Sequence, residues 1–263
     1  MRSDIERYIA VSARVDTTDI NWEEAREAGL SDDEVFVLTY FSDVENQTIR
    51  YMKMLLGMKI AFKPDVAAFL AMWNYEEFFH GFELMRLMEV CGRQVEDRRE
   101  YNHQRLRFNE MLENMFVPVL SRVFSDQFPA VYLSFGAIQE MTTLRAYEHL
   151  RSYTRNPVLE ILCDRIAKQE RRHFAWYFNH ARDLLEEFPS ARKLTRRLME
   201  FNWVPVGAGF HTPAEVKRLF TTIFYPIENA RNLVREIDGK IGTLPGLEGI
   251  RLMEPFFTKA GAI

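Results

Sequence analysis

The chain has 263 residues, of which 47% are apolar, 27% charged and 13% aromatic, and its formal net charge is −4. This length suits one large globular domain with a sizeable core, and the composition excludes a disordered or low-complexity chain. The small acidic excess argues against nucleic-acid binding by bulk charge. The two cysteines, Cys91 and Cys163, exclude a disulfide framework and a four-cysteine zinc site, and they favour a reducing compartment.

The N-terminal residues do not resemble a targeting segment. Residues 1–10 carry charges throughout and lack the apolar core of a signal peptide. The apolar runs, such as residues 67–73, are much shorter than the ~18 residues that a membrane span requires. We therefore expect a soluble cytoplasmic protein without a membrane span.

Helical patterns fill the chain, and sustained strand-type alternation is absent from the sequence. Two capping boxes mark helix starts, Ser31 with Glu34 and Thr212 with Glu215, and Gly92 is a typical helix stop. The patterns predict helices over residues 31–59, 64–91, 98–124, 130–153, 156–187, 190–201 and 212–241.

Several of these helices are about 23–32 residues long, which favours a helical bundle. We predict an all-α fold that forms a single domain over residues 1–263. Its bundle would occupy about residues 30–188, and a helical extension would follow over about residues 190–263. Residues 204–210 contain one proline and two glycines and are the best candidate for a linker.

Four glutamates lie on helix faces that are otherwise apolar. Glu45 shares its face with Leu38, Phe41, Ile49 and Met52 at helical spacing. The same pattern surrounds the other three, which are Glu77, Glu140 and Glu170. A buried carboxylate without a partner is costly, so this pattern predicts a compensating charge.

Two of these glutamates are followed by histidine at the third position. Glu77 precedes His80, and Glu170 precedes His173. Residues three apart on a helix point to the same side, so each E-x-x-H presents a carboxylate and an imidazole together. A single E-x-x-H can arise by chance. Glu100 and the histidine three residues later form such a motif, but their helix face is polar and is expected to be solvated.

The pattern is duplicated. Glu45 precedes the first E-x-x-H by 32 residues, and Glu140 precedes the second by 30. Four carboxylates neutralise two divalent cations, and carboxylate with imidazole suits iron or manganese. Two single glutamates plus two E-x-x-H pairs are the ligand set of ferritin-like di-iron four-helix bundles. We therefore predict a ferritin-like four-helix bundle. Its six metal ligands would be Glu45, Glu77, His80, Glu140, Glu170 and His173.

Several segments of the chain resemble the soluble acyl-carrier-protein desaturases, and the resemblance covers about residues 30–180. The segments that carry it are Trp73-x-x-Glu76-Glu77-x-x-His80-Gly81, Gln139-Glu140-x-x-Thr143 and Glu170-x-x-His173 with Tyr177. The resemblance implies two irons, with Glu77 and Glu170 as bridging ligands and Thr143 as a proton donor beside the oxygen-binding face. It also implies O₂, a ferredoxin-like electron donor, an acyl carrier protein and a homodimer.

The chain departs from that family at Gln169, where the family usually has aspartate. The departure bears on the route of electron delivery or the identity of the donor. Trp22 either belongs to such a route or has a packing or surface role. Basic residues at 93–107 and 192–197 could dock an acidic carrier, or they are solvated helix faces. Apolar residues suited to an acyl slot, or simply to the core, are Phe78, Phe79, Met111, Met115, Phe116 and Phe135.

Three alternatives stay open. The same site could serve a hydroxylase or oxygenase of another metabolite, or the chain could be a non-catalytic iron-binding protein. An inactive paralogue is the third, and the presence of all six ligands argues against it. The same donor set suits two irons or a manganese–iron pair.

Overall fold

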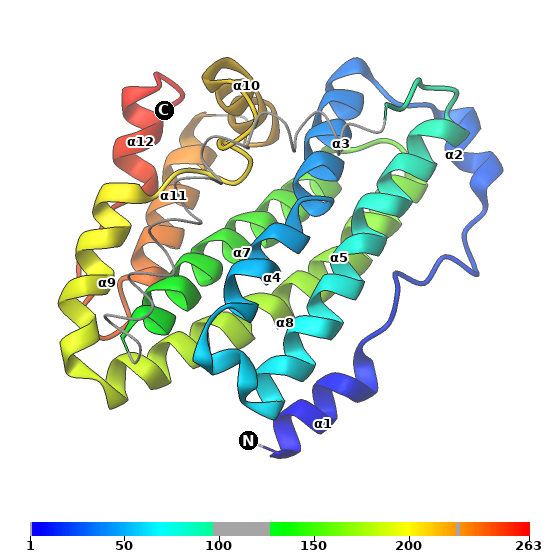
Figure 1. Cartoon of the computed structure of the whole chain (residues 1–263). Helices are drawn as coiled ribbons and strands as arrows, with labels where there is room; N and C mark the ends of the chain where they lie inside the picture. Colours follow the sequence, from blue (N-terminus) through cyan, green and yellow to red (C-terminus); the bar gives the residue numbers. More distant parts are fainter. Residues whose placement is uncertain (1, 97–126, 225–226) are drawn as a thin grey trace. The chain divides into compact units, whose positions relative to one another are not determined.

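The computed structural model describes residues 2–96, 127–224 and 227–263 (Figure 1). Every regular element in these ranges is helical, which confirms the all-α prediction. The elements are α1 (Arg2–Val11), α2 (Trp22–Ala28), α3 (Asp32–Glu45), α4 (Thr48–Leu56), the 3₁₀ helix η1 (Lys59–Phe62), α5 (Pro64–Val90), α7 (Phe128–Tyr153), α8 (Pro157–Glu187), α9 (Pro189–Asn202), α10 (Pro213–Ile223), α11 (Ile227–Ile241) and α12 (Met253–Lys259).

Some sequence predictions fall outside the described residues. They are the helix over residues 98–124, the isolated Glu100-x-x-His103 motif, the apolar residues Met111, Met115 and Phe116, and the basic residues of the 93–107 cluster beyond Glu96. None of the helices in the described ranges is long and apolar enough to cross a membrane.

The predicted helix starts follow from local capping. The Ser31 hydroxyl accepts a hydrogen bond from the Glu34 backbone N–H, and the Glu34 carboxylate accepts one from the Ser31 N–H. The same reciprocal pair joins Thr212 and Glu215 at the start of α10. Both boxes satisfy N–H groups that a helix start otherwise leaves without partners.

The predicted helix over residues 31–59 is wrong in its middle. Helix α3 ends at Glu45, two residues form a turn, and α4 begins at Thr48. Asn46 is a weak helix former, and the N–H of Gln47 bonds to the carbonyl of Val44, three residues back, instead of continuing the α pattern. The break rotates the following residues, so that Ile49 is 52% exposed instead of sharing the face of Glu45.

The predicted helix over residues 212–241 is also wrong as a single element. Helix α10 ends at Ile223, and α11 begins at Ile227. Pro226 lies between them in the sequence, and a proline lacks the N–H that a continuous helix needs. The short helices α1, α2 and α12 have no counterpart in the prediction, whereas the predicted linker over residues 204–210 does form turns.

The chain divides into two compact units. The first comprises Met1–Arg107 and Leu150–Gln169, and the second comprises Phe108–His149 and Glu170–Ile263. The single-domain prediction stays a prediction. In the first unit, α1, α2, α3, α4 and η1 all pack against α5, and α3 runs beside α5 in Figure 1. The side chains that fill this contact include Val37, Leu38, Leu84 and Leu87, which are fully buried.

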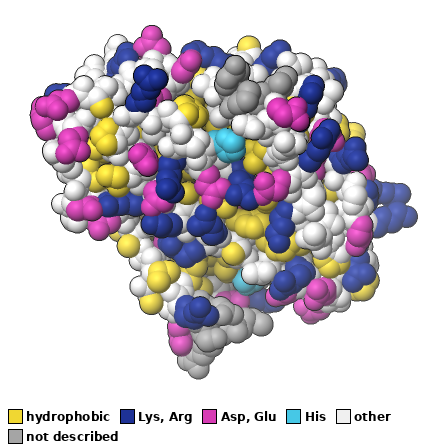
Figure 2. All heavy atoms as spheres, turned by 180° about the vertical axis from the view of Figure 1, so that it is seen from behind, with side chains coloured by type: hydrophobic (Ala, Val, Ile, Leu, Met, Phe, Trp, Pro, Cys, Tyr) yellow, Lys and Arg dark blue, Asp and Glu magenta, His cyan; other side chains and the backbone are white. Residues whose placement is uncertain are grey.

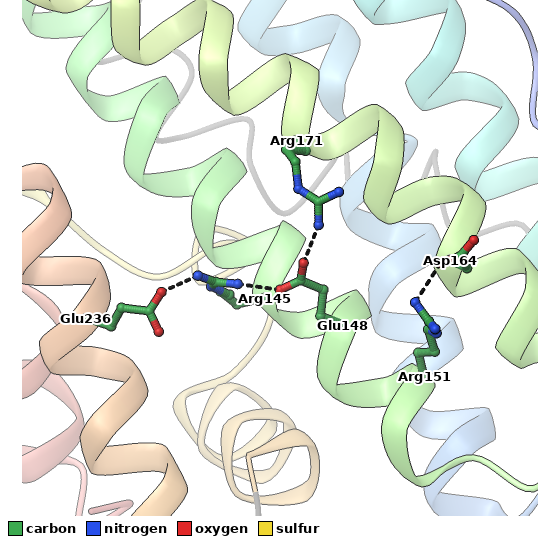
Figure 3. A network of polar contacts seen from close by, with 6 residues as sticks. All are labelled: Arg145, Glu148, Arg151, Asp164, Arg171 and Glu236. Carbon is green, nitrogen blue, oxygen red and sulfur yellow. Dashed lines mark hydrogen bonds and ion pairs between the residues drawn. The ribbon is translucent and has the colours of Figure 1, made fainter.

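In the second unit, α11 packs against α12, and the stacked rings of Phe220 and Phe257 join α10 to α12. Figure 3 shows Arg145 of α7 between two carboxylates, Glu148 of the same helix and Glu236 of α11. Arg171 of α8 donates a hydrogen bond of 2.6 Å to the other oxygen of Glu148. These ion pairs are partly exposed, so each adds little to stability and mainly sets how the three helices align.

A separate pair drawn in Figure 3 belongs to the first unit. Arg151, near the end of α7, donates a hydrogen bond of 2.6 Å to Asp164 of α8. It joins the two helices across the short turn between them.

Candidate metal centre

The first unit gathers a triad of metal-ligating side chains. Glu45 is the last residue of α3, and Glu77 and His80 lie one turn apart in the middle of α5. The Nδ1 atom of His80 is 3.5 Å from Oε2 of Glu77 and 3.9 Å from Oε2 of Glu45. All three side chains are buried, and their donor atoms lie within 4.8 Å of one another. The three residues therefore converge on one point inside the unit.

A glycine allows α3 to approach α5 at this point. Gly81 follows His80, and a Cβ atom added to it would lie 3.3 Å from Cβ of Glu45 and 3.3 Å from Oδ1 of Asn46. Such distances are tighter than ordinary van der Waals contact, so a larger residue would push the end of α3 away. The glycine thus helps to place Glu45 against the E-x-x-H pair.

The second unit repeats the same arrangement. Glu140 comes from α7, and Glu170 and His173 come from α8. The Nδ1 atom of His173 is 3.6 Å from Oε2 of Glu140 and 3.5 Å from Oε2 of Glu170. This triad is also buried, with donor atoms within 4.8 Å of one another. In each unit, one single glutamate and one E-x-x-H pair meet.

A glycine also allows the close helix contact in this unit. A Cβ atom added to Gly136 of α7 would lie 2.4 Å from the Tyr177 ring of α8. Gly136 precedes Glu140 by one turn, and Tyr177 follows His173 by one turn. The tyrosine ring therefore packs on the bare backbone of α7, next to the triad.

The geometry of both triads fits a divalent cation. The distances from Nδ1 to Oε2, 3.5–3.9 Å, exceed the ~2.7–3.2 Å of a hydrogen bond. Two ligands that each bind one ion at ~2.1 Å lie roughly 3–3.5 Å apart, so a small inward movement would complete coordination. Carboxylate and imidazole donors are those that iron and manganese accept. Within the described ranges, the clusters that could hold an ion consist of these six residues alone.

Gln169 contacts the first triad directly. Its Oε1 atom is 2.7 Å from Nε2 of His80, and its Nε2 atom donates to the carbonyl oxygen of Ala13 at 2.7 Å. The sequence pattern identified Gln169 only as a departure from the family. The contact with His80 joins residues 89 positions apart, so no local pattern could reveal it.

Two further carboxylates are buried on α5 that the sequence did not single out as a pair. Glu76 and Glu83 of α5 are both 0% exposed. The hydroxyl of Tyr8 donates to Glu76 at 3.1 Å, and Arg14 pairs with Glu83 at 2.5 Å. Their spacing of four and three residues around His80 places all three on one face of α5, a signal that the sequence did contain.

The other residues singled out in the sequence differ in their position and exposure. Thr143 is half-buried and follows Glu140 by one turn on α7. Trp22 begins α2, and the guanidinium of Arg86 lies 4.1 Å from the centre of its ring. Phe78 is 46% exposed on α5, so its setting differs from the core position that its helix suggested. Phe135 is half-buried.

The chain matches a known protein family. The sequence model of a family described as fatty acid desaturase matches residues 13–205, which include both triads. No curated protein matches the chain.

Proposed function

The chain belongs to the fatty acid desaturase family, and from this premise we propose that it is an O₂-dependent di-iron oxidase that desaturates a fatty acyl chain bound to an acyl carrier protein. Membership of the family makes the chain a desaturase-type oxidoreductase. The pair of triads carries the finer proposal, because each brings two buried carboxylates to the Nδ1 atom of one histidine.

Helix α8 supports the combination of the two triads into one dinuclear centre. Gln169 bonds to His80 of the first triad, and the next residue, Glu170, belongs to the second. One helix therefore carries, at consecutive positions, a contact of the first triad and a member of the second. A ferritin-like bundle would bring the helices of both units around this stretch of α8.

Charge balance supports two ions rather than one. Four buried carboxylates carry four negative charges, and leaving them uncompensated would cost several kcal/mol per ion, on the order seen for other buried charges. Two divalent cations neutralise them while both histidines stay neutral. Iron is the metal that desaturase chemistry requires, and a manganese–iron pair fits the same donors.

The two ions would share six protein ligands. The residues that would hold them are the histidines and glutamates of the two triads: His80, His173, Glu45, Glu77, Glu140 and Glu170. When bound, the iron pair supplies the activation of O₂ and the removal of hydrogen from an unactivated C–H bond.

The protein's own residues would exclude water from the metal centre, supply a proton and position the acyl chain. The buried setting of both triads keeps bulk water from the ions and strengthens the electrostatic interactions there. Thr143 lies on the Glu140 face of α7, and its Oγ1 atom would hold a proton near the reacting oxygen. Apolar side chains of α5 and α7 would have to position the acyl chain.

The partners stay proposals at this point. Figure 2 shows a face on which Lys and Arg side chains are interspersed with Asp and Glu. In the α9 cluster, Arg192 donates to the carbonyl of Leu185 and Arg196 to that of Glu248, whereas Lys193 and Arg197 are exposed. These two would offer charge to an acidic carrier. A ferredoxin-like electron donor and a homodimer are further expectations.

Metal content tests the site. We expect about two irons per chain after expression in iron-replete medium, with near-UV charge-transfer absorption. Glu77→Ala should lose most of the iron and the absorption, because one buried ligand and its charge are removed. The control is Glu100→Ala, which alters the isolated E-x-x-H motif and should retain both. Well-folded wild-type protein that holds neither iron nor manganese after reconstitution would rule out the di-metal proposal.

Product analysis separates the remaining functions. Acyl carrier proteins loaded with different fatty acids would be incubated with O₂, ferredoxin and a reductant, and the acyl chains examined by mass spectrometry. An alkene supports the desaturase, and an alcohol supports a hydroxylase with the same centre. Uptake of far more than two irons per chain without any product would indicate an iron-storage protein.

A further inference from the structure

We propose that Gln169 is a positioning residue, which fixes the tautomer of His80 and ties this ligand to an N-terminal strap formed by residues 8–14. The inference rests on the proposed function in one respect only, because it takes His80 to be a metal ligand. All the contacts that carry it lie within the first unit.

The orientation of the Gln169 amide follows from its two partners. The carbonyl oxygen of Ala13 can only accept a hydrogen bond, so the NH₂ end of the amide must be the end that faces it, at 2.7 Å. The amide oxygen therefore faces Nε2 of His80, also at 2.7 Å. Nε2 must then donate, so the neutral imidazole carries its lone pair on Nδ1.

This tautomer directs the lone pair of Nδ1 toward the carboxylates. Nδ1 is the atom that lies 3.5 Å from Glu77 and 3.9 Å from Glu45. A metal ion between these groups needs an unprotonated Nδ1. A hydrogen bond from the other ring nitrogen is how proteins set a ligating histidine in advance. Gln169 thus prepares His80 for coordination before any metal arrives.

The strap is attached to the same face of α5 that carries His80. Tyr8 bonds to Glu76, one turn before His80, and Arg14 pairs with Glu83, about one turn after it. Both carboxylates are 0% exposed, so these hydrogen bonds help to compensate their burial, and Arg86 of α5 also pairs with Glu83. Between these two anchors, the Ala13 carbonyl receives the amide of Gln169.

An amide is required for this double link. A carboxylate at position 169 could accept from His80, but it could not donate to a backbone carbonyl. The amide of glutamine supplies the acceptor and the donor on separate atoms, and the shorter asparagine would not span the same gap. The residue that departs from the family pattern therefore joins the strap to the metal ligand, and metal binding and strap attachment should favour each other.

The first test is the tautomer of His80 in the metal-free protein. The chain has six histidines, so selective ¹⁵N labelling gives a simple NMR spectrum, and His80→Gln identifies the signal. At a pH where the His80 ring is neutral, we expect its proton on Nε2 in the wild type and a loss of this preference in Gln169→Leu. An Nδ1-protonated form in the wild type would overturn the proposal, whether or not the protein binds metal.

The second test is the affinity for Fe²⁺, measured without oxygen in competition with a chromophoric chelator. Gln169→Leu should weaken binding about 10- to 100-fold, as loss of a partner to a ligating histidine typically does. Gln139→Leu is the matched control, because Gln139 precedes Glu140 as Gln169 precedes Glu170 but bonds to the Val204 carbonyl. Equal affinity in all three folded proteins would overturn the positioning role and leave the di-metal proposal standing.

The third test separates the two hydrogen bonds of Gln169. Gln169→Glu keeps an acceptor for His80 but removes the donor to Ala13. Fe²⁺ should slow amide hydrogen exchange of residues 8–14 in the wild type and have a smaller effect in Gln169→Glu. Equal slowing in both proteins would show that the strap is not connected through Gln169.

Discussion

At the scale of single residues, the site depends on groups that are small or neutral as much as on its ligands. Gly81 and Gly136 each allow close helix contact beside one triad. Gln169 lies against a ligand without binding metal itself in our proposal. Substitutions at such positions act by displacing a ligand or a helix, so they are sensitive tests of the geometry.

Gly136→Ala should lower the free energy of unfolding by about 1–3 kcal/mol, because the new methyl group overlaps the Tyr177 ring. Gly239→Ala is the control, since a Cβ atom there meets nothing within 4 Å and alanine favours the helix. Chemical denaturation of both variants measures the difference. If Gly136→Ala is as stable as Gly239→Ala, the close contact between α7 and Tyr177 is absent in solution.

At the scale of elements, short helices are held by side chains from their longer neighbours. Asp238 of α11 is buried, and its Oδ1 atom accepts hydrogen bonds from the backbone N–H groups of Leu252 and Met253, at the start of α12. Oδ2 accepts a third from Glu254. One carboxylate thus replaces the cap that the α12 sequence lacks.

Asp238→Ala should reduce the free energy of unfolding by about 1–3 kcal/mol, because it leaves buried N–H groups without partners. Asp238→Asn, which keeps an acceptor, should be less harmful. Asp183→Ala, at an exposed position paired with Arg182, should have almost no effect. Near-equal stability of the Asp238→Ala and Asp183→Ala proteins would contradict the capping role.

The same residue predicts a pH dependence. Burial raises the pKa of Asp238 above its ordinary value of 3.8, and the backbone hydrogen bonds from α12 oppose the rise. The folded state therefore binds the proton more tightly than the unfolded state. The contribution of this group to the free energy of unfolding is therefore fully present below pH 3.8. It is lost as the pH rises through the pKa that Asp238 has in the folded state. The advantage of wild type over Asp238→Asn should accordingly be larger near pH 4 than at neutral pH.

At the scale of the whole molecule, two units each contribute one triad, and α8 belongs to both. The proposed centre would draw its ligands from four helices, α3, α5, α7 and α8. Metal binding should therefore stabilise the fold as a whole, since a site made of residues from distant helices does not exist in the unfolded chain.

Removal of iron by a chelator should lower the melting temperature of the wild type, and restoring Fe²⁺ without oxygen should reverse the change. Metal present at a hundred times its dissociation constant adds about 2.7 kcal/mol of stability. Glu77→Ala should melt at the same temperature with and without Fe²⁺. A wild-type melting temperature that does not respond to iron would show that the triads do not hold it.

The sequence by itself determined the features that depend on one helix at a time. Capping at Ser31 and Thr212, the extents of α5, α7 and α8, and the E-x-x-H pairs all follow from interactions within a turn or two. The three-dimensional structure sets the burial of Glu83 against Arg14 and the contact of Gln169 with His80. Each of these depends on the packing of segments far apart in the chain, where the free energy of contact outweighs local propensity. Periodicity can therefore indicate which residues face inward, but packing selects the partners that they meet.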